Sequence, residues 1–321
     1  MPSHRLKIGV ALWNQVTTWP QVAAAARLMD ALRYDSAWTW DHVYAPSGDP
    51  YQPVFDGWTL LTALAPITEH LELGLFVGAN TFRNPGLAAK AATTLDHVSD
   101  GRAIVGLGAA WFELEHTAYG IEFGRSPGER IGWLDESAGA IRALLDGEAV
   151  TSPTGGHYAF RDLRLNPPPV RPHVPLMIGG SGERRTLRVV ARHADMWNMG
   201  GTPDELRHKD AVLREHCAAV GRDEAEIERT VACKMVIRDD PAEARAVYRR
   251  QLVANTAPLE RLESPTAWLG TPAQVAAQIR EFTAFGFWTV IIEMPAPYDV
   301  ETLERFATEV RPLVEAGGAA G

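Results

Sequence analysis

The stretch PLMIGGSGERRTLRVVAR, residues 175–192, has the order of a strand, a glycine turn and a helix. The apolar run at 176–178 predicts a short buried strand, and apolar residues at helical spacing within 183–192 predict an amphipathic helix. In the turn at 179–182, glycines without Cβ atoms let the backbone approach a ligand, and the helix behind adds its positive dipole end. The pattern suits a bound phosphate, but a tight turn that binds nothing can have the same sequence.

The alternation of strand and helix continues in both directions from this stretch. The predicted strands are residues 7–13, 36–40, 71–78, 102–108, 176–179, 195–198, 228–237 and 289–293. The predicted helices are residues 19–32, 58–67, 86–98, 130–145, 183–192, 204–220, 241–252, 271–285 and 300–314. This alternation predicts an α/β fold of the (β/α)8 TIM-barrel class. A doubly wound open sheet is the alternative, although no GxGxxG motif follows the first strand.

Two irregular segments interrupt the alternation. Residues 111–173 contain the predicted helix 130–145 and then the Gly/Pro-dense sequences TGGHYAF and NPPPVRP, in which proline excludes helix and central strand. Residues 254–270 form the second irregular segment. We therefore expect a single barrel domain over residues 1–321, with insertions at these two places that shape the substrate pocket.

The composition is that of a globular protein and argues against a polyanionic partner. The 321 residues are 46% hydrophobic and 22% charged, with a formal net charge of −9, so nucleic acid is not an expected partner. The two cysteines, Cys217 and Cys233, have no CxxC spacing and are expected to be reduced thiols. No apolar run approaches the roughly 20 residues of a membrane helix and no signal peptide precedes the first strand, which predicts a cytoplasmic protein with no membrane partner.

An aspartate and a histidine follow each other at the end of the second predicted strand. Because the carboxyl ends of barrel strands meet at one mouth, Asp41 and His42 are expected to face a common site. A histidine titrates near neutrality and can transfer a proton, and a nearby carboxylate can fix its charge and tautomer. We therefore predict that His42 and Asp41 are catalytic, against the alternative of a capping aspartate and a packed histidine.

The candidates for the substrate pocket also lie at strand ends and have two interpretations each. Trp13, Trp111 and Trp197 can wall an aromatic pocket for a flat ligand or belong to the core. Glu293 can bind substrate or pair with an arginine at the rim of the barrel.

Three further features of the sequence can each be interpreted either as part of a binding site or as part of the packing and surface of the protein. Gly106 and Gly108 can serve the approach of a ligand or close packing at the rim. The arginines within 184–188 can contact an anion or form a solvated helix face. Glu113 and His116 lie at helical spacing, but no HExxH or similar ligand pattern is present, so no metal site is predicted.

The run NTFRNPGLAAKAATTLDHVSDGRAIVGLGAAWFELEHTAYG, residues 80–120, together with PLMIGGSGERRTL and ADMWN, strongly resembles the bacterial luciferase-like flavin-dependent oxidoreductases. The resemblance is closest to their coenzyme F420-dependent branch and spans nearly the whole chain. It implies a (β/α)8 barrel with the isoalloxazine or deazaflavin ring at its mouth and the cofactor phosphate near residues 179–183. It also implies a non-prolyl cis peptide within 76–79, His42 beside the reacting ring with Asp41 as its neighbour, and a homodimer.

The resemblance supports three functional hypotheses that share one fold. The first is an oxidoreductase that transfers a hydride between F420 and a small organic substrate, with His42 as proton donor or acceptor. The second is an FMN-dependent monooxygenase that uses O2, and the third is a flavin-binding protein without turnover. The arginines within 184–188 can meet the anionic polyglutamate tail that F420 has and FMN lacks. The expected cofactor-binding residues are Val77, Gly78, Ala79, Asn80, Gly108, Ala109, Ala110, Gly179, Gly180, Ser181, Gly182 and Glu183.

Overall fold

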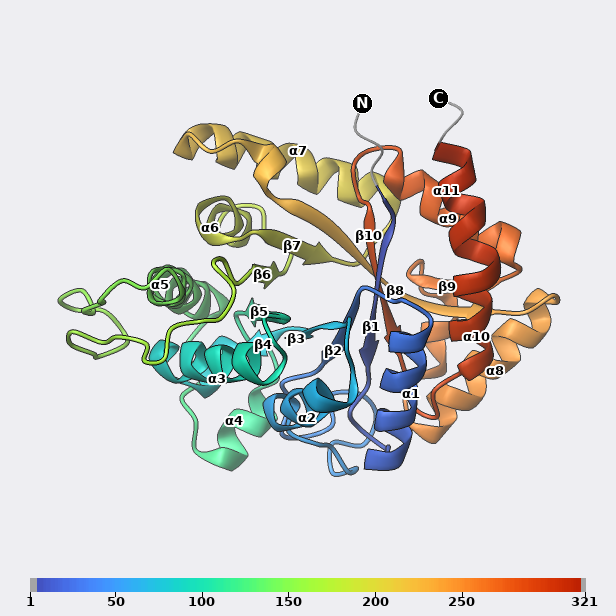
Figure 1. Ribbon diagram of the computed structural model, residues 1–321, viewed down its shortest axis with the longest axis horizontal. Helices are drawn as coiled ribbons and strands as arrows, with labels where there is room; N and C mark the ends of the chain where they lie inside the picture. The colour runs from blue at the N-terminus through green and yellow to red at the C-terminus, as the bar shows by residue number, and fades with distance from the viewer. Residues whose placement is uncertain (1–4, 319–321) are drawn as a thin grey trace.

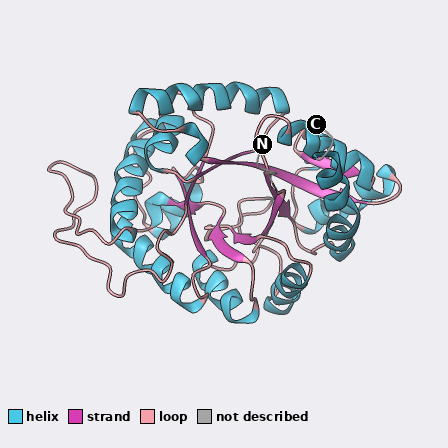
Figure 2. Ribbon diagram, turned by 45° about the horizontal axis from the view of Figure 1, so that its top comes forward, coloured by secondary structure: helices cyan, strands magenta, loops and turns pink. Residues whose placement is uncertain are grey.

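A closed barrel of parallel strands stands at the centre of the protein, inside a ring of helices (Figure 2), in a computed structural model that describes residues 5–318. The strands are β1 (Lys7–Leu12), β2 (Ser36–Thr39), β3 (Glu72–Leu75), β4 (Gly78–Ala79), β5 (Ala103–Gly108), β6 (Leu176–Gly179), β7 (Met196–Met199), β8 (Glu228–Ile237), β9 (Ala267–Gly270) and β10 (Thr289–Met294). The ring runs β1, β2, β3, β5, β6, β7, β8, β10 and closes because β10 pairs in parallel with both β1 and β8. The predicted (β/α)8 barrel is therefore confirmed, and the open sheet is wrong.

The helices cover the outside of the barrel (Figure 1). They are α1 (Trp19–Ala31), α2 (Gly57–Leu64), α3 (Pro85–Val98), α4 (Glu113–Tyr119), α5 (Pro127–Leu145), α6 (Thr186–His193), α7 (Pro203–Val220), α8 (Pro241–Ala254), α9 (Pro272–Thr283), α10 (Val300–Arg305) and α11 (Arg311–Gly318). Thr202 and Thr271 begin α7 and α9 with capping boxes, each followed by a proline at the first helical position. Within residues 5–318, no helix has both the length and the hydropathy required to span a membrane.

Two apolar layers arise because successive side chains of a strand point to opposite faces. Outward-facing residues such as Ile8 and Val10 of β1 pack against the helices in the main core. The inward-facing residues fill the barrel, namely Ala11, Trp38, Ile104, Met177, Met196 and Ile291. Phe76 and Val77 pack onto this inner cluster and separate it from the mouth of the barrel.

The third predicted strand, residues 71–78, is interrupted. β3 ends at Leu75, a non-prolyl cis peptide joins Phe76 to Val77, and β4 follows at Gly78. This position lies within residues 76–79 and confirms what the resemblance implies there. The helix predicted from residue 183 begins later, at Thr186, because the glycine turn continues to Arg185 in a non-helical conformation.

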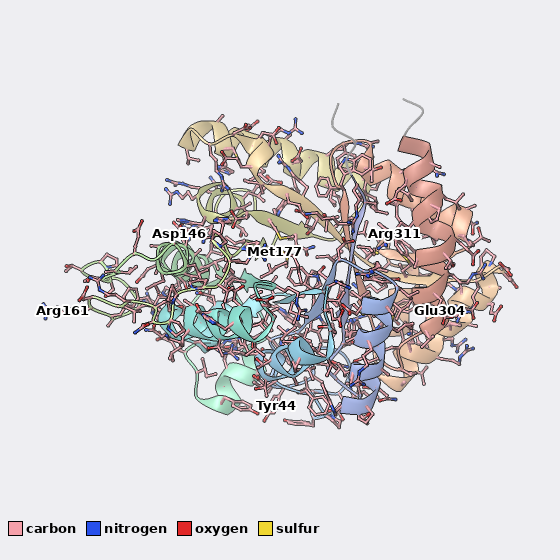
Figure 3. All side chains as sticks on the ribbon, viewed as in Figure 1. Tyr44, Asp146, Arg161, Met177, Glu304 and Arg311 are labelled. Atoms are coloured by element: carbon pink, nitrogen blue, oxygen red, sulfur yellow. The ribbon has the colours of Figure 1, made fainter. Side chains whose placement is uncertain are left out.

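The two predicted insertions contain more regular structure than expected. α5 lies in the helix ring between α3 and α6 (Figure 1), so the segment that projects from the barrel is shorter than residues 111–173. Residues 146–175 form this projection, with Arg161 at its far end (Figure 3). In the segment 254–270, a 3-10 turn, Leu259–Glu263, precedes β9, which pairs with the outer half of β8.

Candidate active site

A cavity of about 910 Å³ opens at the carboxyl ends of the barrel strands. This volume is within the range of small-molecule and cofactor sites. The predicted site residues that line it are Asp41, His42, Val77, Gly78, Ala79, Gly108, Ala109, Ala110, Trp111, Gly179, Gly180, Ser181 and Glu293. The barrel therefore brings together residues from five separate strand ends, as the convergence of the strands requires.

The floor of the cavity is a close contact between Val77 and two glycines. A Cβ atom at Gly108 would lie 2.7 Å from Val77 Cγ2, and one at Gly179 would lie 3.0 Å from it. A Cβ at Gly106 would lie 1.9 Å from the Leu75 carbonyl oxygen. The glycines of β5 thus serve close packing, which decides one of the choices that the sequence left open, and Gly108 also lines the cavity.

Asp41 accepts a hydrogen bond from the backbone of this floor. Arg83 donates to both of its carboxylate oxygens at 2.9 and 2.7 Å, and the Ala79 N–H donates to Oδ2 at 2.9 Å. Burial raises the pKa of Asp41, while the Arg83 guanidinium acts in the opposite direction. The expectation that Asp41 assists His42 needs correction, because its oxygens are committed to Arg83 and Ala79.

Glu115 is the carboxylate that contacts His42. Glu115 Oε1 lies 2.9 Å from His42 Nδ1, and Oε2 accepts from the backbone N–H groups of Val43 and Tyr44. When the carboxylate accepts from the ring, the proton of a neutral imidazole lies on Nδ1. His42 Nε2 has no hydrogen-bond partner among the described residues, and His42 lines the cavity. The ring can therefore exchange a proton with a bound molecule.

Sequence reasoning missed Glu115 because α4 has no apolar stripe to mark its buried face. The buried residues of this helix are Glu115 and His116. Both ring nitrogens of His116 are committed, Nδ1 to the Phe112 carbonyl oxygen at 2.8 Å and Nε2 to Thr81 Oγ1 at 2.6 Å. Within residues 5–318, no group of His, Cys, Asp and Glu side chains has the arrangement of a metal site.

The glycine turn that follows β6 forms part of the cavity wall. Gly180 has a φ of 131°, its N–H donates to the Asn198 carbonyl oxygen, and its own oxygen accepts from Trp197 Nε1 at 2.8 Å. In the described structure, the N–H groups of Ser181 and Gly182 have no acceptor. These groups, ahead of α6, can bind an anion as the sequence suggested.

Arg130 adds a positive charge beside this turn. It begins the buried face of α5, is 7% exposed and lines the cavity with Ser181. Its guanidinium lies 3.9 Å from the centroid of Phe123 and donates weakly to two carbonyl oxygens, at 3.3 and 3.4 Å. No carboxylate between residues 5 and 318 forms an ion pair with it, and burial lowers its pKa. Sequence reasoning missed Arg130, although it stands on one apolar stripe with Trp133 and Leu134.

Five predicted site residues do not line the cavity. Trp13 is buried beneath Trp40, with ring centroids 4.5 Å apart. Trp197 faces the helix layer because its neighbour Met196 faces the barrel interior. Asn80 is buried against Tyr158. The remaining two are Gly182, which is exposed, and Glu183, which is paired with Lys209 and His208.

The structure also shows the partners of the charged residues that the sequence singled out at the mouth of the barrel. Glu293 pairs with Lys234 of β8 at 2.7 Å, so its partner is a lysine and not the arginine that the sequence suggested. The three arginines within 184–188 are exposed, and Arg185 donates to the Gly128 carbonyl oxygen at 2.9 Å.

Known proteins resemble this chain in sequence and in fold. Residues 6–289 match the family described as luciferase-like monooxygenase. The chain is 28% identical over 306 residues to the F420-dependent glucose-6-phosphate dehydrogenase of Kineococcus radiotolerans, covering 87% of this chain and 88% of that protein.

Solved structures of other proteins have a similar fold at lower sequence identity. An F420-dependent secondary alcohol dehydrogenase in complex with an F420–acetone adduct superposes with a TM-score of 0.83 at 19% identity, over 97% of this chain and 99% of the other. A monooxygenase from Streptomyces bottropensis superposes with a TM-score of 0.77 at 22% identity, over 96% of this chain and 99% of the other. At these identities the two structures establish the shared fold.

Proposed function

Since the chain belongs to the luciferase-like monooxygenase family, we propose that it is an oxidoreductase that transfers a hydride between coenzyme F420 and a small organic substrate. Members of this family are oxidoreductases or monooxygenases, so the choice of cofactor and reaction is the part that we propose. The relative from Kineococcus radiotolerans and the alcohol dehydrogenase structure support F420, because both are named as F420-dependent.

The observation that carries the proposal is the state of His42. When an alcohol carbon loses a hydride and becomes a carbonyl, the hydroxyl proton must go to a base, and the reverse reaction must return it. His42 offers an unpartnered Nε2 in the cavity wall, and the buried Glu115 holds its Nδ1 at 2.9 Å. Glu115 also stabilises the imidazolium that forms when Nε2 takes a proton.

The residues present fit a cofactor that is long and anionic. The cavity can hold a ring system over Val77, Gly108 and Gly179, and Arg130 with the N–H groups of Ser181 and Gly182 can hold a phosphate. When bound, the deazaflavin of F420 would supply hydride chemistry with little reactivity towards oxygen. A homodimer and a cytoplasmic location stay predictions of the sequence.

Titration of the apoprotein with F420 and with FMN, followed by spectroscopy at low and high salt, tests the proposal. We expect F420 to bind more tightly and its affinity to fall as salt increases, because its tail and phosphate are anionic. Tight FMN binding without F420 binding would replace the proposal with an FMN-dependent monooxygenase. Binding of F420 with no reaction that depends on His42 would leave a flavin-binding protein without turnover.

A further inference from the structure

Arg261 lines the cavity without an acidic partner. It lies in the 3-10 turn Leu259–Glu263, is partly buried, and places its guanidinium 5.6 Å from the centroid of the Trp13 ring. In the part of the chain that the structure describes, no carboxylate forms an ion pair or hydrogen bond with this guanidinium. The neighbouring cation of the wall, Lys234, is by contrast neutralised by Glu293 at 2.7 Å. The wall near Arg261 therefore carries a net positive charge in a chain whose formal net charge is −9.

Three buried polar groups, one of them in the cavity wall, also lack partners. Ser47, which is 2% exposed and lines the same cavity, has no partner for its Oγ among the described residues. The same holds, within residues 5–318, for Trp13 Nε1 below the guanidinium and for the hydroxyl of Tyr248. Burial raises the pKa of Tyr248, and the charges of Arg261 and Glu293 act on it in opposite directions, so both are near. Buried polar groups without partners are rare in native proteins and call for an explanation such as a ligand or water.

This corner is remote from the proposed cofactor phosphate. Trp13 follows β1, whereas the glycine turn and Arg130 border the end of β6. In the ring order β1, β2, β3, β5, β6, β7, β8, β10, the strands β1 and β6 stand on opposite sides. Arg261 and Arg130 are therefore separate positive charges of one cavity.

We propose that Arg261 binds an anionic oxygen group of the substrate, so that the substrate is a small organic acid or phosphate ester and not a neutral alcohol. A guanidinium presents several N–H donors in a planar fork that matches a carboxylate or phosphate, and partial burial strengthens such a contact. The Ser47 hydroxyl and the free donors of Lys234 can complete the site. His42 lines the same cavity, so one molecule held at Arg261 can present its reacting carbon beside His42. This inference rests on the proposed function for its reaction, but the anion site itself does not.

Calorimetric titration of the apoprotein and of the F420-loaded protein with lactate, glucose 6-phosphate and 2-propanol tests the site. We expect at least one of the two anions to bind more tightly than 2-propanol, which identifies the anionic group as carboxylate or phosphate. Arg261→Gln should lower the affinity for that anion by roughly 10- to 100-fold, as is usual for the loss of a hydrogen bond to a charged group. The affinity for 2-propanol should stay unchanged. Arg261→Lys should retain part of the affinity, and high salt should weaken the wild-type contact.

Arg250→Gln is the matched control, because Arg250 is an exposed arginine of α8 outside the cavity wall. It should bind all three probes as the wild type does. The inference is overturned if neither anion binds better than 2-propanol, or if Arg261→Gln keeps full anion affinity while F420 still binds. If the wild type binds no F420 but binds an anion through Arg261, the proposed function fails and the anion site stands.

Discussion

His42 and Glu115 are 73 positions apart in the sequence, yet His42 Nδ1 lies 2.9 Å from Glu115 Oε1. Glu115 is 1% exposed, and its other hydrogen bonds come from backbone N–H groups, so His42 is the only side chain among the described residues with which it forms a hydrogen bond. The pair couples the end of β2 to α4. It leaves the second ring nitrogen, Nε2, for a molecule bound in the cavity.

His42→Ala should fold and bind cofactor but lose about 10²- to 10⁴-fold in the rate of hydride transfer, the usual contribution of a general acid–base group. Single-turnover kinetics at saturating cofactor measure this rate separately from binding. An unchanged rate would remove His42 from the mechanism.

Glu115→Gln should slow the same step by roughly 10- to 100-fold, as is found for the hydrogen-bond partners of metal-bound histidines. Because Glu115 holds Nδ1 and not the ring nitrogen that faces the cavity, the loss should appear in the rate of the chemical step and not in cofactor affinity. Glu113→Gln is the control, since Glu113 is an exposed residue of the same helix. Equal single-turnover rates for the two variants would show that Glu115 only supports the loop.

Gly108→Ala should lower the free energy of unfolding by about 1–3 kcal/mol, because its Cβ would meet Val77 Cγ2 at 2.7 Å in a packed floor. Cofactor affinity should fall as well, since Gly108 and Val77 line the cavity. Gly132→Ala is the control: this glycine of α5 has nothing within 4 Å of the new Cβ, and the change should stabilise the protein by about 0.5–1 kcal/mol. Urea denaturation and cofactor titration of both variants check these signs. A Gly108→Ala protein as stable as the wild type would show that the floor can move aside.

The barrel was predictable because its strands are short runs buried on both faces. Residues 176–178 are apolar at every position, and glycines or polar residues end such runs, so strand positions stand out without an alternating pattern. Proline after a Thr cap marks helix starts such as that of α7. The cis peptide between Phe76 and Val77 has no comparable signal in its own residues, and only the resemblance indicated it.

The site was less predictable because its contacts join distant segments. His42 could be found from its strand end, but its partner Glu115 lies on a helix without an apolar pattern. Trp197 was misplaced although alternation could have excluded it: if Met196 fills the barrel, the next side chain must face the helices. Arg130 could have been noticed as an arginine on the apolar stripe of α5.

Asp30→Ala should destabilise the protein by about 1–3 kcal/mol near pH 7, because the carboxylate accepts from three backbone N–H groups ahead of β3. Although burial acts to raise it, the N–H groups of Glu69, His70 and Leu71 hold the pKa of Asp30 below its ordinary value. A carboxyl whose pKa is lower in the folded state stabilises above its unfolded pKa of about 4, and this contribution disappears as the pH falls further.

The difference in free energy of unfolding between wild type and Asp30→Ala should therefore be larger at pH 7 than at pH 3, as measured by urea denaturation. Glu304→Ala serves as the control, because Glu304 is exposed and its side chain forms no hydrogen bond or ion pair within residues 5–318. A difference for Asp30→Ala that does not change with pH would contradict a role for the ionised carboxylate.

Arg130→Gln decides which positive charge meets an anionic cofactor. Arg130 is buried and lines the cavity, whereas Arg188 is an exposed residue of α6, one of the arginines for which the sequence left open an anion contact or a solvated helix face. A buried cation interacts with an anion more strongly than a solvated cation does. Arg130→Gln should therefore lower the affinity for F420 by roughly 10- to 100-fold and reduce the salt dependence of binding. Arg188→Gln should change both quantities little, and Arg130→Lys should keep part of the affinity. Isothermal titration at two salt concentrations, with urea denaturation to check folding, measures all three variants. If Arg188→Gln loses affinity while Arg130→Gln keeps it, the exposed face of α6 and not the cavity wall holds the charged part of the cofactor.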